Sequence, residues 1–591
     1  MPILIDTVRI SGFRGIKNVE VKLAKNIILL GTNNSGKTSF LKSLQLSLGD
    51  YQRYLSEEDF HIDVNGVKVD EILVDIKIVP IGLDGNRVNE FEYEWVDVFS
   101  DSIQMESDGY QYVSFRTKSE IDKIKGGFLS QRYFLDEWPE FDGWQALKVS
   151  EKNRMKQRFN AIPYISIEAQ RDIHNELKDK SSFIGKVLSY IEYSEGDVTA
   201  LEEMVKKIND AAVDKSPPLQ SLTKHLQDLN QSFLGASHAE ITPFPKKIRD
   251  LSKQFSVHFG EGEDSSFSME YHGTGTRSWA SMLTVKSFLD FMKGRYEEES
   301  MPLSPVIGAE EPEAHLHPNA QRTLYKQLIS TDGQIILSTH SPYLSAMADV
   351  ENIRSFIKCG NKLSVNSLKN KLDSDERNAL RREIMLTRGE LLFSRALILC
   401  EGITEEQMIP SMFELYFNKT LFSVGVNCVS VGGKNYPPFV KLACSIGIPV
   451  YIVSDNDGKT QAEIEIQIKK LEKELSIPLD ENIFSVSYLG EGNDIEAELL
   501  MVLKLRGEVI DALVLSETKG SDNSQYLQAK RRELNALSDK DILEKMRSSK
   551  ASYAGFLSEV LMKNKNSKKN EELIPVAIID SFNKIKGWLE L

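Results

Sequence analysis

The stretch PVIGAEEPEAHLHP, from Pro305 to Pro318, is the one relative to which the other motifs of this chain are placed. An apolar lead-in ends in two adjacent carboxylates, Glu310 and Glu311, and a proline then ends the expected strand. In a nucleotide-hydrolysing site, the first carboxylate of such a pair reaches the metal ion and the second polarises the water beside the γ-phosphate. Paired glutamates before a proline are also typical of a solvated turn, so the interpretation depends on the neighbouring motifs.

Two further motifs favour a nucleotide site. GTNNSGKT at Gly31–Thr38 matches the phosphate-binding pattern GxxxxGKS or GxxxxGKT, between an expected strand at 26–30 and an expected helix at 39–48. QIILSTHSP at 334–342 is a second apolar strand, which leads to His340. Together the three motifs predict an ATPase of the ABC type.

The phosphate-binding loop has a defined chemistry. Its backbone N–H groups and the following helix start hold phosphate oxygens, Lys37 reaches the β- and γ-phosphates, and the Thr38 hydroxyl binds Mg²⁺. We expect Glu311 and His340 to position the attacking water and to sense the γ-phosphate. The predicted ATP-binding residues in this part of the site are Gly31, Asn33, Asn34, Ser35, Gly36, Lys37, Thr38, Ser39 and Glu310.

A glycine-rich turn, YHGTGTRSWASM at 271–282, predicts the second wall of the same site. Ser278 opens an expected helix at 279–291, and a glycine turn before a helix start is suited to an anion. ABC ATPases carry their signature motif at this place in the order, where it contacts the γ-phosphate held by a second subunit. A helix-capping turn is the alternative. The predicted contacts are Gly273, Gly275, Arg277 and Ser278.

Size and charge limit the functional classes. A chain of 591 residues has enough material for two or three domains. A formal net charge of −15 argues against a surface made for general nucleic-acid binding, although it leaves room for a local basic channel. The four cysteines lack zinc-site spacing, and no apolar run reaches transmembrane length. We therefore expect a cytoplasmic protein with no membrane partner.

A second set of acids follows two apolar strands in the C-terminal third. RALILCEGITEE at 395–406 and PVYIVSDND at 449–457 each end in carboxylates, and parallel strands collect ligands beyond their carboxyl ends. Clustered carboxylates repel one another, and hard divalent cations such as Mg²⁺ or Mn²⁺ relieve that repulsion. Taken singly, strand-end acids are more often helix caps or turn formers. The predicted metal ligands are Glu401, Glu405, Asp455 and Asp457.

This arrangement resembles a Toprim domain, and behind an ABC ATPase it resembles the OLD family of nucleases. The motifs GTNNSGKT, HGTGTRS, EEPEAHLHP, STHSP, CEGITEE and SDND stand in the family's order and cover nearly the whole chain. The resemblance implies one more acidic ligand, for which Glu496 is the best match, ahead of Asp494 and Glu498. It also implies a lysine that stabilises the transition state, matched by Lys550. An ordinary surface lysine is the alternative.

The resemblance implies an ATP-regulated, divalent-metal-dependent DNA endonuclease that acts in anti-phage defence, as family members do in Gabija and retron systems. The implied cofactors are ATP and Mg²⁺ or Mn²⁺ at both sites. The implied partners are DNA, further copies in a homodimer or higher homo-oligomer, and a defence partner, either a protein or a complex of reverse transcriptase and nucleic acid. Two rivals stay open: a topoisomerase-like strand-passage enzyme, and an ATP-driven DNA clamp or sensor whose Toprim acids hold metal structurally.

The expected fold class is α/β. We expect an ABC ATPase domain at 1–373, with a largely helical insertion for dimerisation at about 127–266. A helical connector at 374–390 then precedes a Toprim domain with a C-terminal helical part at 391–591.

Local patterns add finer predictions. Alternation at Ile72–Ile78 predicts a half-exposed antiparallel strand, and 201–212 and 222–234 are expected to be amphipathic helices. Thr404 is expected to cap a helix, with Gln407 completing a capping box. The basic run at 563–569 is a solvated loop or a DNA-backbone contact.

Overall fold

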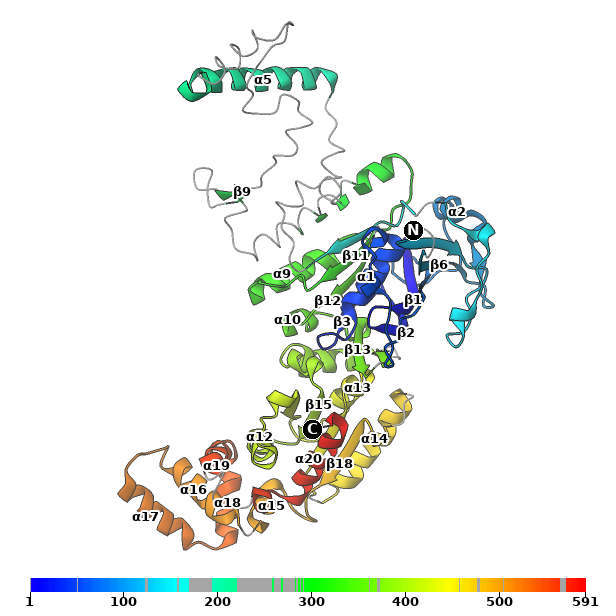
Figure 1. Cartoon of the computed structure of the whole chain (residues 1–591). Helices are drawn as coiled ribbons and strands as arrows, with labels where there is room; N and C mark the ends of the chain where they lie inside the picture. The colour runs from blue at the N-terminus through cyan, green and yellow to red at the C-terminus, as the bar shows by residue number, and fades with distance from the viewer. Residues whose placement is uncertain are drawn as a thin grey trace.

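The computed structural model describes the chain in two lobes, an N-terminal lobe with two large sheets and a C-terminal lobe with one parallel sheet and a group of helices (Figure 1). The predicted signature residues at 273–278, Asp457, the predicted helix at 222–234 and residues 564–569 of the basic run lie outside the described residues. The structure describes all residues except 1, 50, 123–125, 157–158, 169–193, 221–257, 260–266, 269–281, 283–284, 287–288, 291, 361, 369–371, 457, 476–478, 503, 564–569 and 591.

The first sheet of the N-terminal lobe is antiparallel. Its strand order is β2-β1-β4-β6-β5, and β7 pairs with β6. Long apolar runs on these strands face α1 and bury one side of the sheet. The strands are β1 (Ile3–Phe13), β2 (Ile16–Lys22), β4 (Glu71–Pro80), β5 (Gln104–Met105), β6 (Gln111–Ile121) and β7 (Phe128–Phe134).

The second sheet is parallel except at one edge and carries the nucleotide motifs. Its order is β14-β13-β3-β12-β11-β8, and only the β13–β14 pair runs antiparallel. The predicted strand at 26–30 is confirmed as β3. The strands are β3 (Asn26–Leu30), β8 (Tyr164–Ile167), β11 (Val306–Glu310), β12 (Gln334–Ser338), β13 (Ile353–Cys359) and β14 (Lys362–Asn366).

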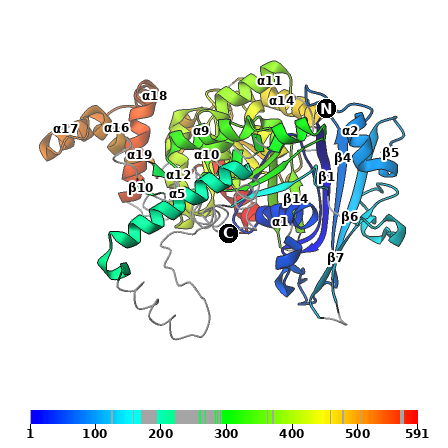
Figure 2. The same cartoon turned by 90° about the horizontal axis from the view of Figure 1, so that it is seen from above.

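Helix α1 (Lys37–Leu48) lies between the two sheets. Its buried residues belong to one apolar cluster with residues of β1, β4 and β6 on one side and of β3 and β12 on the other. Figures 1 and 2 both show α1 beside β1. Helices α9 (Pro318–Ile329) and α10 (Pro342–Ser345) follow β11 and β12, and α2 (Tyr93–Phe99) stands beside the antiparallel sheet.

The antiparallel strand predicted at Ile72–Ile78 is confirmed within β4, but the prediction that it is half-exposed is wrong. Strand β4 is buried along nearly its whole length, and Asp75 is fully buried within it. Arg116 on the neighbouring strand donates to both oxygens of Asp75, at 2.7 and 2.8 Å, and Arg9 stands opposite Asp75 on the other neighbour. Burial raises the pKa of the Asp75 carboxyl, against the lowering effect of Arg116. The alternating pattern suggested that Asp75 faces solvent, but a cross-strand ion pair with Arg116 takes the place of its contacts with water.

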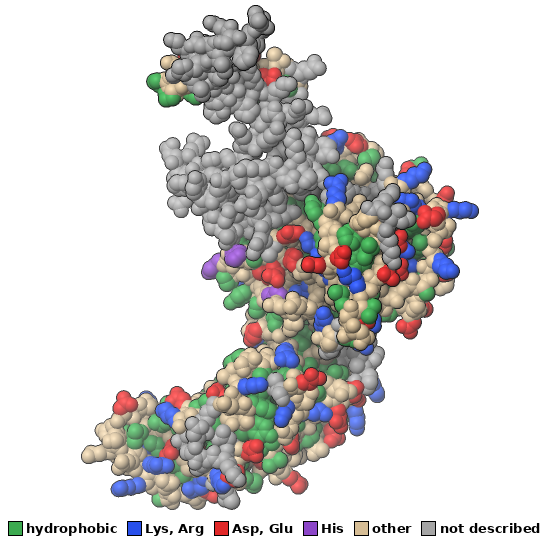
Figure 3. All heavy atoms as spheres, viewed as in Figure 1, with side chains coloured by type: hydrophobic (Ala, Val, Ile, Leu, Met, Phe, Trp, Pro, Cys, Tyr) green, Lys and Arg blue, Asp and Glu red, His purple; other side chains and the backbone are tan. Residues whose placement is uncertain are grey.

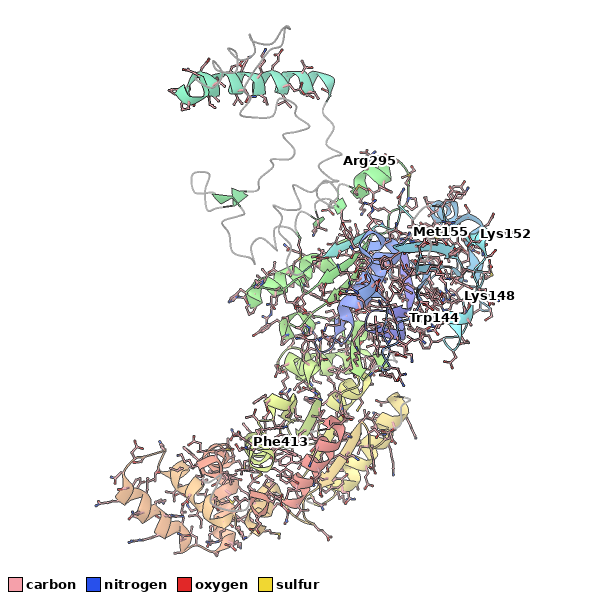
Figure 4. All side chains as sticks on the ribbon, in the orientation of Figure 1. Trp144, Lys148, Lys152, Met155, Arg295 and Phe413 are labelled. Carbon is pink, nitrogen blue, oxygen red and sulfur yellow. The ribbon has the colours of Figure 1, made fainter. Side chains whose placement is uncertain are left out.

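A segment without regular strands, 135–155, covers these buried charges. Arg116 also donates to the carbonyls of Trp144 and Leu147, at 2.7 and 2.6 Å, and Arg9 donates to that of Pro139 at 2.7 Å. The Arg9 guanidinium lies 4.2 Å from the centre of the Trp138 ring, a cation–π contact. Figure 4 labels Trp144, Lys148, Lys152 and Met155 along this segment, beside the antiparallel sheet.

The predicted helical insertion begins later than 127. Residues 128–134 and 164–167 are instead strands that pair with β6 and β11 in the two sheets of the N-terminal lobe. The helix predicted at 201–212 is confirmed within α5 (Glu195–Asp214), which Ser194 caps. A short antiparallel pair lies at the end of the insertion, with β9 (His258–Phe259) inside its predicted range and β10 (Phe267–Ser268) directly after it.

The connector is helical in only part of its predicted range. Helix α11 (Ser374–Leu380) has a capping box formed by Asp373 and Glu376, as its sequence favours. A π-helical turn, Arg381–Met385, follows, and a short 3₁₀ helix at Gly389–Phe393 (η11) leads into the C-terminal lobe.

The C-terminal lobe is built on a parallel sheet of order β16-β15-β17-β18. One face shares an apolar core with α9, the connector and the parallel sheet of the N-terminal lobe, and the other packs against the C-terminal helices. The strands are β15 (Ala396–Cys400), β16 (Val426–Ser430), β17 (Val450–Ser454) and β18 (Phe484–Tyr488). The helices are α12 (Ile403–Phe417), α13 (Pro437–Ser445), α14 (Thr460–Leu475), α15 (Ile495–Met501), α16 (Arg506–Glu517), α17 (Ser524–Asn535), α18 (Asp539–Ser548), α19 (Lys550–Lys563) and α20 (Val576–Leu589).

The visible surface carries both signs of charge (Figure 3), in agreement with the expectation that it is not made for general nucleic-acid binding. Acidic and basic side chains are interspersed over the face shown in Figure 3. In the part of the chain that the structure describes, no helix has the length and apolar character needed to cross a membrane.

Candidate functional site

The first site lies at the carboxyl edge of the parallel ATPase sheet. Strands β3, β12 and β11 are neighbours and run parallel, so the phosphate loop, the loop with His340 and the glutamate pair reach the same edge. A cavity of about 1050 Å³ at this edge is lined by residues 33–39 and by Glu311 and His340. Two cations that the sequence analysis did not select, Arg14 and Lys358, line it as well. Arg14 lies 18 residues before Thr32 in the chain, and Lys358 lies 322 residues after Gly36.

The phosphate-binding loop is tightly folded. Lys37 donates to the carbonyls of Gly31 and Thr32, at 2.7 and 3.0 Å. Gly31 has a φ of +148°, and a Cβ at this position would lie 2.5 Å from the Phe356 carbonyl oxygen, so only glycine fits. Burial lowers the pKa of the Lys37 ammonium, and the nearby Glu311 and Glu310 oppose that effect.

The two glutamates have separate partners. The Thr38 hydroxyl donates to Glu310, which joins the two predicted Mg²⁺-binding groups of this site. Glu311 has a left-handed φ of 42°, and its carboxylate lies 3.5 Å from Nε2 of His340. The sharp turn after Glu310 therefore directs the second carboxylate toward the histidine rather than along the strand.

A third glutamate, Glu313, holds the histidine loop. It is buried and accepts hydrogen bonds from the Thr339 hydroxyl and, at 3.0 Å, from the backbone N–H of His340. Burial raises the pKa of Glu313. Burial also lowers the pKa of His340, and the charge of Lys37 adds to that effect, which favours a neutral imidazole. The sequence showed Glu313 without a role, and only the fold supplies its partners.

The second site lies at the carboxyl edge of the parallel sheet in the C-terminal lobe. Strands β15 and β17 are parallel neighbours, so Glu401 and Asp455 reach one edge as predicted. Ser454 donates to Oε1 of Glu401 at 2.7 Å. The Glu405 carboxylate folds back over the turn and lies close to Gly402. A Cβ added at Gly402 would be only 3.1 Å from Oε2 of Glu405.

Burial and mutual repulsion perturb these acids. Burial raises the pKa of Asp455 to about 8, and the charges of Glu405 and Glu401 add to the effect. Burial likewise raises the pKa of Glu405 to about 7, with Glu496 and Glu401 contributing. Oδ1 of Asp455 is buried and has no hydrogen-bond partner among the described residues. An unpartnered carboxylate oxygen among other acids fits a hard cation.

The alternatives for the further acid differ in their partners. Glu496 is fully buried and accepts from the Thr404 hydroxyl at 3.1 Å. Asp494 instead caps α15 and accepts from Arg547 at 2.7 Å, and Glu498 accepts from Asn493 at 2.7 Å. Among the three, Glu496 raises the pKa of both Glu405 and Asp455, and the charge of Asp494 also raises the pKa of Asp455. No three His, Cys, Asp or Glu side chains form a ready metal site among the described residues, which leave out Asp457.

Lys550 lies beside this cluster, at the start of α19. Its Nζ is 3.1 Å from Oε2 of Glu496, and its side chain is about half exposed. Burial disfavours the ammonium, but the contact with Glu496 and the charge of Asp494 outweigh it and raise the pKa of Lys550. The lysine is thus held charged next to the acids, with one side open to solvent.

One local expectation, the helix cap at Thr404, is wrong. The N-cap residue of α12 is Gly402, without a side-chain cap, so the predicted capping box of Thr404 and Gln407 does not form. The Thr404 hydroxyl binds Glu496, which lies 92 residues later, instead. Sequence reasoning also missed Tyr436 and Tyr553, whose hydroxyls are buried beside the acids; burial raises the pKa of both phenols.

The raised pKa values predict a pH dependence of stability. Asp455 and Glu405 have ordinary pKa values of 3.8 and 4.5, so between about pH 4 and pH 8 the folded chain binds protons that the unfolded chain has lost. Their contribution is fully present below that window and is lost as the pH rises through the folded pKa values. In a metal chelator, the unfolding temperature is expected to fall from pH 5.5 to pH 8.5.

The Asp455→Asn variant serves as the control, because it removes the repelling charge. Differential scanning calorimetry of both proteins is expected to show a smaller fall in the variant, and added Mg²⁺ is expected to restore wild-type stability at the higher pH. An equal fall in both proteins would contradict the repulsion.

Comparison with known proteins agrees with the two-lobe arrangement. The family described as protein of unknown function DUF2813 matches residues 3–389, and the Toprim domain of overcoming lysogenization defect protein-like proteins matches residues 392–457. The chain is 21% identical over 462 residues to the endonuclease GajA of Bacillus cereus strain VD045, covering 77% of this chain and 75% of that one.

Two further similarities concern proteins with OLD in their names. The chain is 21% identical over 481 residues to the OLD nuclease of Thermus scotoductus, covering 77% of this chain and 82% of that one. The solved C-terminal region of the Burkholderia pseudomallei OLD protein is 19% identical, covers 33% of this chain and 99% of its own length, and superposes with a TM-score of 0.25. The DUF2813 match covers more than half of the chain, and the OLD-like Toprim domain follows it in the sequence. The chain therefore belongs to the OLD family of nucleases.

Proposed function

We propose that this chain is an ATP-regulated, divalent-metal-dependent DNA endonuclease, in which the ABC ATPase lobe controls phosphodiester cleavage by the Toprim lobe. The observation that carries the proposal is the approach of buried acids at one sheet edge, with a charged lysine beside them. Asp455 has a buried oxygen without a partner in the described part of the chain, and Lys550 lies 3.1 Å from Glu496.

The chemistry follows from the donor set. Glu401, Glu405, Asp455 and Glu496, with Asp457, would hold a divalent cation, which when bound neutralises phosphate charge and acidifies water. Ser454 fixes Glu401, and Thr404 fixes Glu496, so both acids keep their orientation. Lys550 can donate to a phosphate oxygen on which negative charge grows during cleavage.

The ATPase lobe is proposed to hydrolyse ATP. Glu311 accepts the proton of the attacking water, since it stands free of Thr38, while Glu310 stays with the Thr38 hydroxyl at the Mg²⁺ position. His340 is neutral and can donate to the γ-phosphate. We propose that Gly273–Ser278 of a second copy completes the site, so that ATP draws two chains together; light scattering with and without ATP measures that association.

One assay separates the proposal from its rivals. Supercoiled plasmid with Mg²⁺ or Mn²⁺ is expected to yield nicked and linear products. Relaxed closed circles would favour the strand-passage enzyme, and unchanged DNA the clamp. The buried hydroxyls of Tyr436 and Tyr553 argue against strand passage by either residue, because a tyrosine nucleophile must reach the DNA backbone.

Lys550→Ala is expected to lower the cleavage rate by about two orders of magnitude, the size typical for loss of one transition-state donor, with little change in DNA affinity. Single-turnover cleavage and fluorescence anisotropy measure the two quantities. Lys540→Ala, on the exposed first turn of α18 and outside the basic run at 563–569, is the control. Equal losses of affinity and rate would make Lys550 a phosphate anchor only.

A further inference from the structure

A short segment, 388–393, contacts both catalytic lobes. Its last residue, Phe393, stacks on His340 of the nucleotide pocket, with ring centres 6.4 Å apart and planes inclined by 29°. Gly389 lies against α10, because a Cβ there would be 2.7 Å from the carbonyl oxygen of Pro342. The histidine loop of the ATPase site and the helix after it therefore press directly on this segment.

The other end of the segment reaches the Toprim acids. Arg388 donates to the carbonyl of Ser430 at 2.6 Å, at the end of β16. The Ser430 hydroxyl donates to the Glu401 carbonyl at 3.1 Å, and the N–H of Gly433 donates to the same carbonyl at 2.9 Å. The backbone of Glu401 is thus held by a loop that Arg388 anchors.

The chain before the 388–393 segment has a firmly attached part, α11, followed by an irregular part, the π-helical turn. Lys441 of α13 pairs with Glu376, so α11 is fastened to the Toprim lobe. Between α11 and Arg388 lies the π-helical turn, whose wider ring is typical of functional irregularities in helices. Close-packed contacts such as that at Gly389 transmit a displacement rather than absorb it.

We propose that residues 388–393 form a coupling segment through which nucleotide bound at His340 sets the position of Glu401, with Arg388 as a positioning residue for that carboxylate. The proposal rests on the endonuclease function proposed above and supplies its route of regulation. A ligand shifts such an element only if it binds its arrangements with different affinity. The γ-phosphate, proposed above to accept from His340, can do so, because ADP lacks that group.

Hydrogen–deuterium exchange tests the route without depending on cleavage. In the full-length wild type, a non-hydrolysable ATP analogue is expected to change exchange in peptides covering 388–393 and 426–434, compared with ADP. In Phe393→Ala, protection of the loop at 31–38 is expected to persist while the response at 426–434 is lost. Phe422→Ala is the matched control, since the Phe422 side chain is 77% exposed on the Toprim lobe.

Arg388 is tested from the other end, so that a folding defect at Phe393 cannot hide the answer. Arg388→Met keeps an unbranched side chain but removes the guanidinium, which donates to Ser430 and lies 5.8 Å from the centre of the Phe439 ring, whereas Arg388→Lys keeps a charged donor. Arg388→Met is expected to raise the Mn²⁺ concentration for half-maximal cleavage by about 10-fold, as loss of an outer-shell partner does, and Arg388→Lys to recover most of it. ATP hydrolysis is expected to stay unchanged in both.

The cleavage arm separates the two proposals. Wild-type nicking rates with and without ATP are expected to differ by at least about fivefold, and by less than about twofold in Phe393→Ala. If the wild type never cuts DNA, the endonuclease proposal fails, and the exchange data still decide the coupling. The coupling proposal would be wrong if the ATP analogue left exchange at 426–434 unchanged in the wild type. It would also be wrong if the change at 426–434 were equally large in the wild type and in Phe393→Ala.

Discussion

Replacing Glu401 by glutamine, or Asp455 by asparagine, is expected to lower plasmid nicking by at least about 1000-fold, near the upper range for loss of one charge-stabilising group. Each change removes a carboxylate charge from the acidic edge of the Toprim sheet while keeping the shape of the side chain. ATP binding is expected to stay intact, because the phosphate loop belongs to a different sheet. Gel analysis of supercoiled plasmid and nucleotide titration measure the two activities.

Glu406→Gln is the matched control for this experiment. Glu406 follows Glu405 on the first turn of α12, and it is partly exposed whereas Glu405 is buried. Nicking by this variant is expected to remain within about twofold of the wild type, as for most surface changes. Undiminished nicking by both Glu401→Gln and Asp455→Asn would refute the Toprim assignment of catalysis.

Glu311→Gln is expected to reduce ATP hydrolysis by about 100- to 10,000-fold, the range for loss of a general base. Glutamine keeps the size of the side chain but cannot accept the proton of the attacking water. Because ATP still binds, the variant is expected to accumulate in the ATP-bound, associated form. Phosphate release and light scattering in ATP report the two effects.

Glu310→Gln provides the contrast, because Glu310 contacts the Thr38 hydroxyl at the Mg²⁺ position. That change is expected to weaken Mg²⁺-dependent ATP binding itself and to yield no ATP-dependent association. If Glu311→Gln hydrolysed ATP at the wild-type rate, the base would have to be another residue.

The sequence alone was enough to predict the position of residues that directly follow an apolar strand. The carboxylates Glu401 and Asp455 each follow an apolar strand, so parallel pairing was enough to predict their meeting. Thr404 shows the limit: its capping pattern is local, but its hydroxyl binds Glu496, 92 residues away. A local rule cannot foresee a partner that only the fold brings near.

The same limit applies to charge. The polar positions of β4 read as solvent-facing, because alternation says nothing about a partner 41 residues later. Segment 388–393 was equally invisible, since Phe393 and Arg388 have no motif and act through contacts with His340 and Ser430. Chemistry carried by motifs was predictable, whereas positioning by long-range packing was not.

The buried charges of the antiparallel sheet constrain how this chain can diverge. Losing Asp75 alone would leave Arg116 charged and unpaired in the interior, a change that destabilises by about 3–5 kcal/mol. Replacing both with apolar residues of similar volume can be nearly neutral. Each single step is therefore disfavoured while the double step is tolerated, so the two positions should be inherited as a unit, with Trp144 and the covering segment changing alongside them.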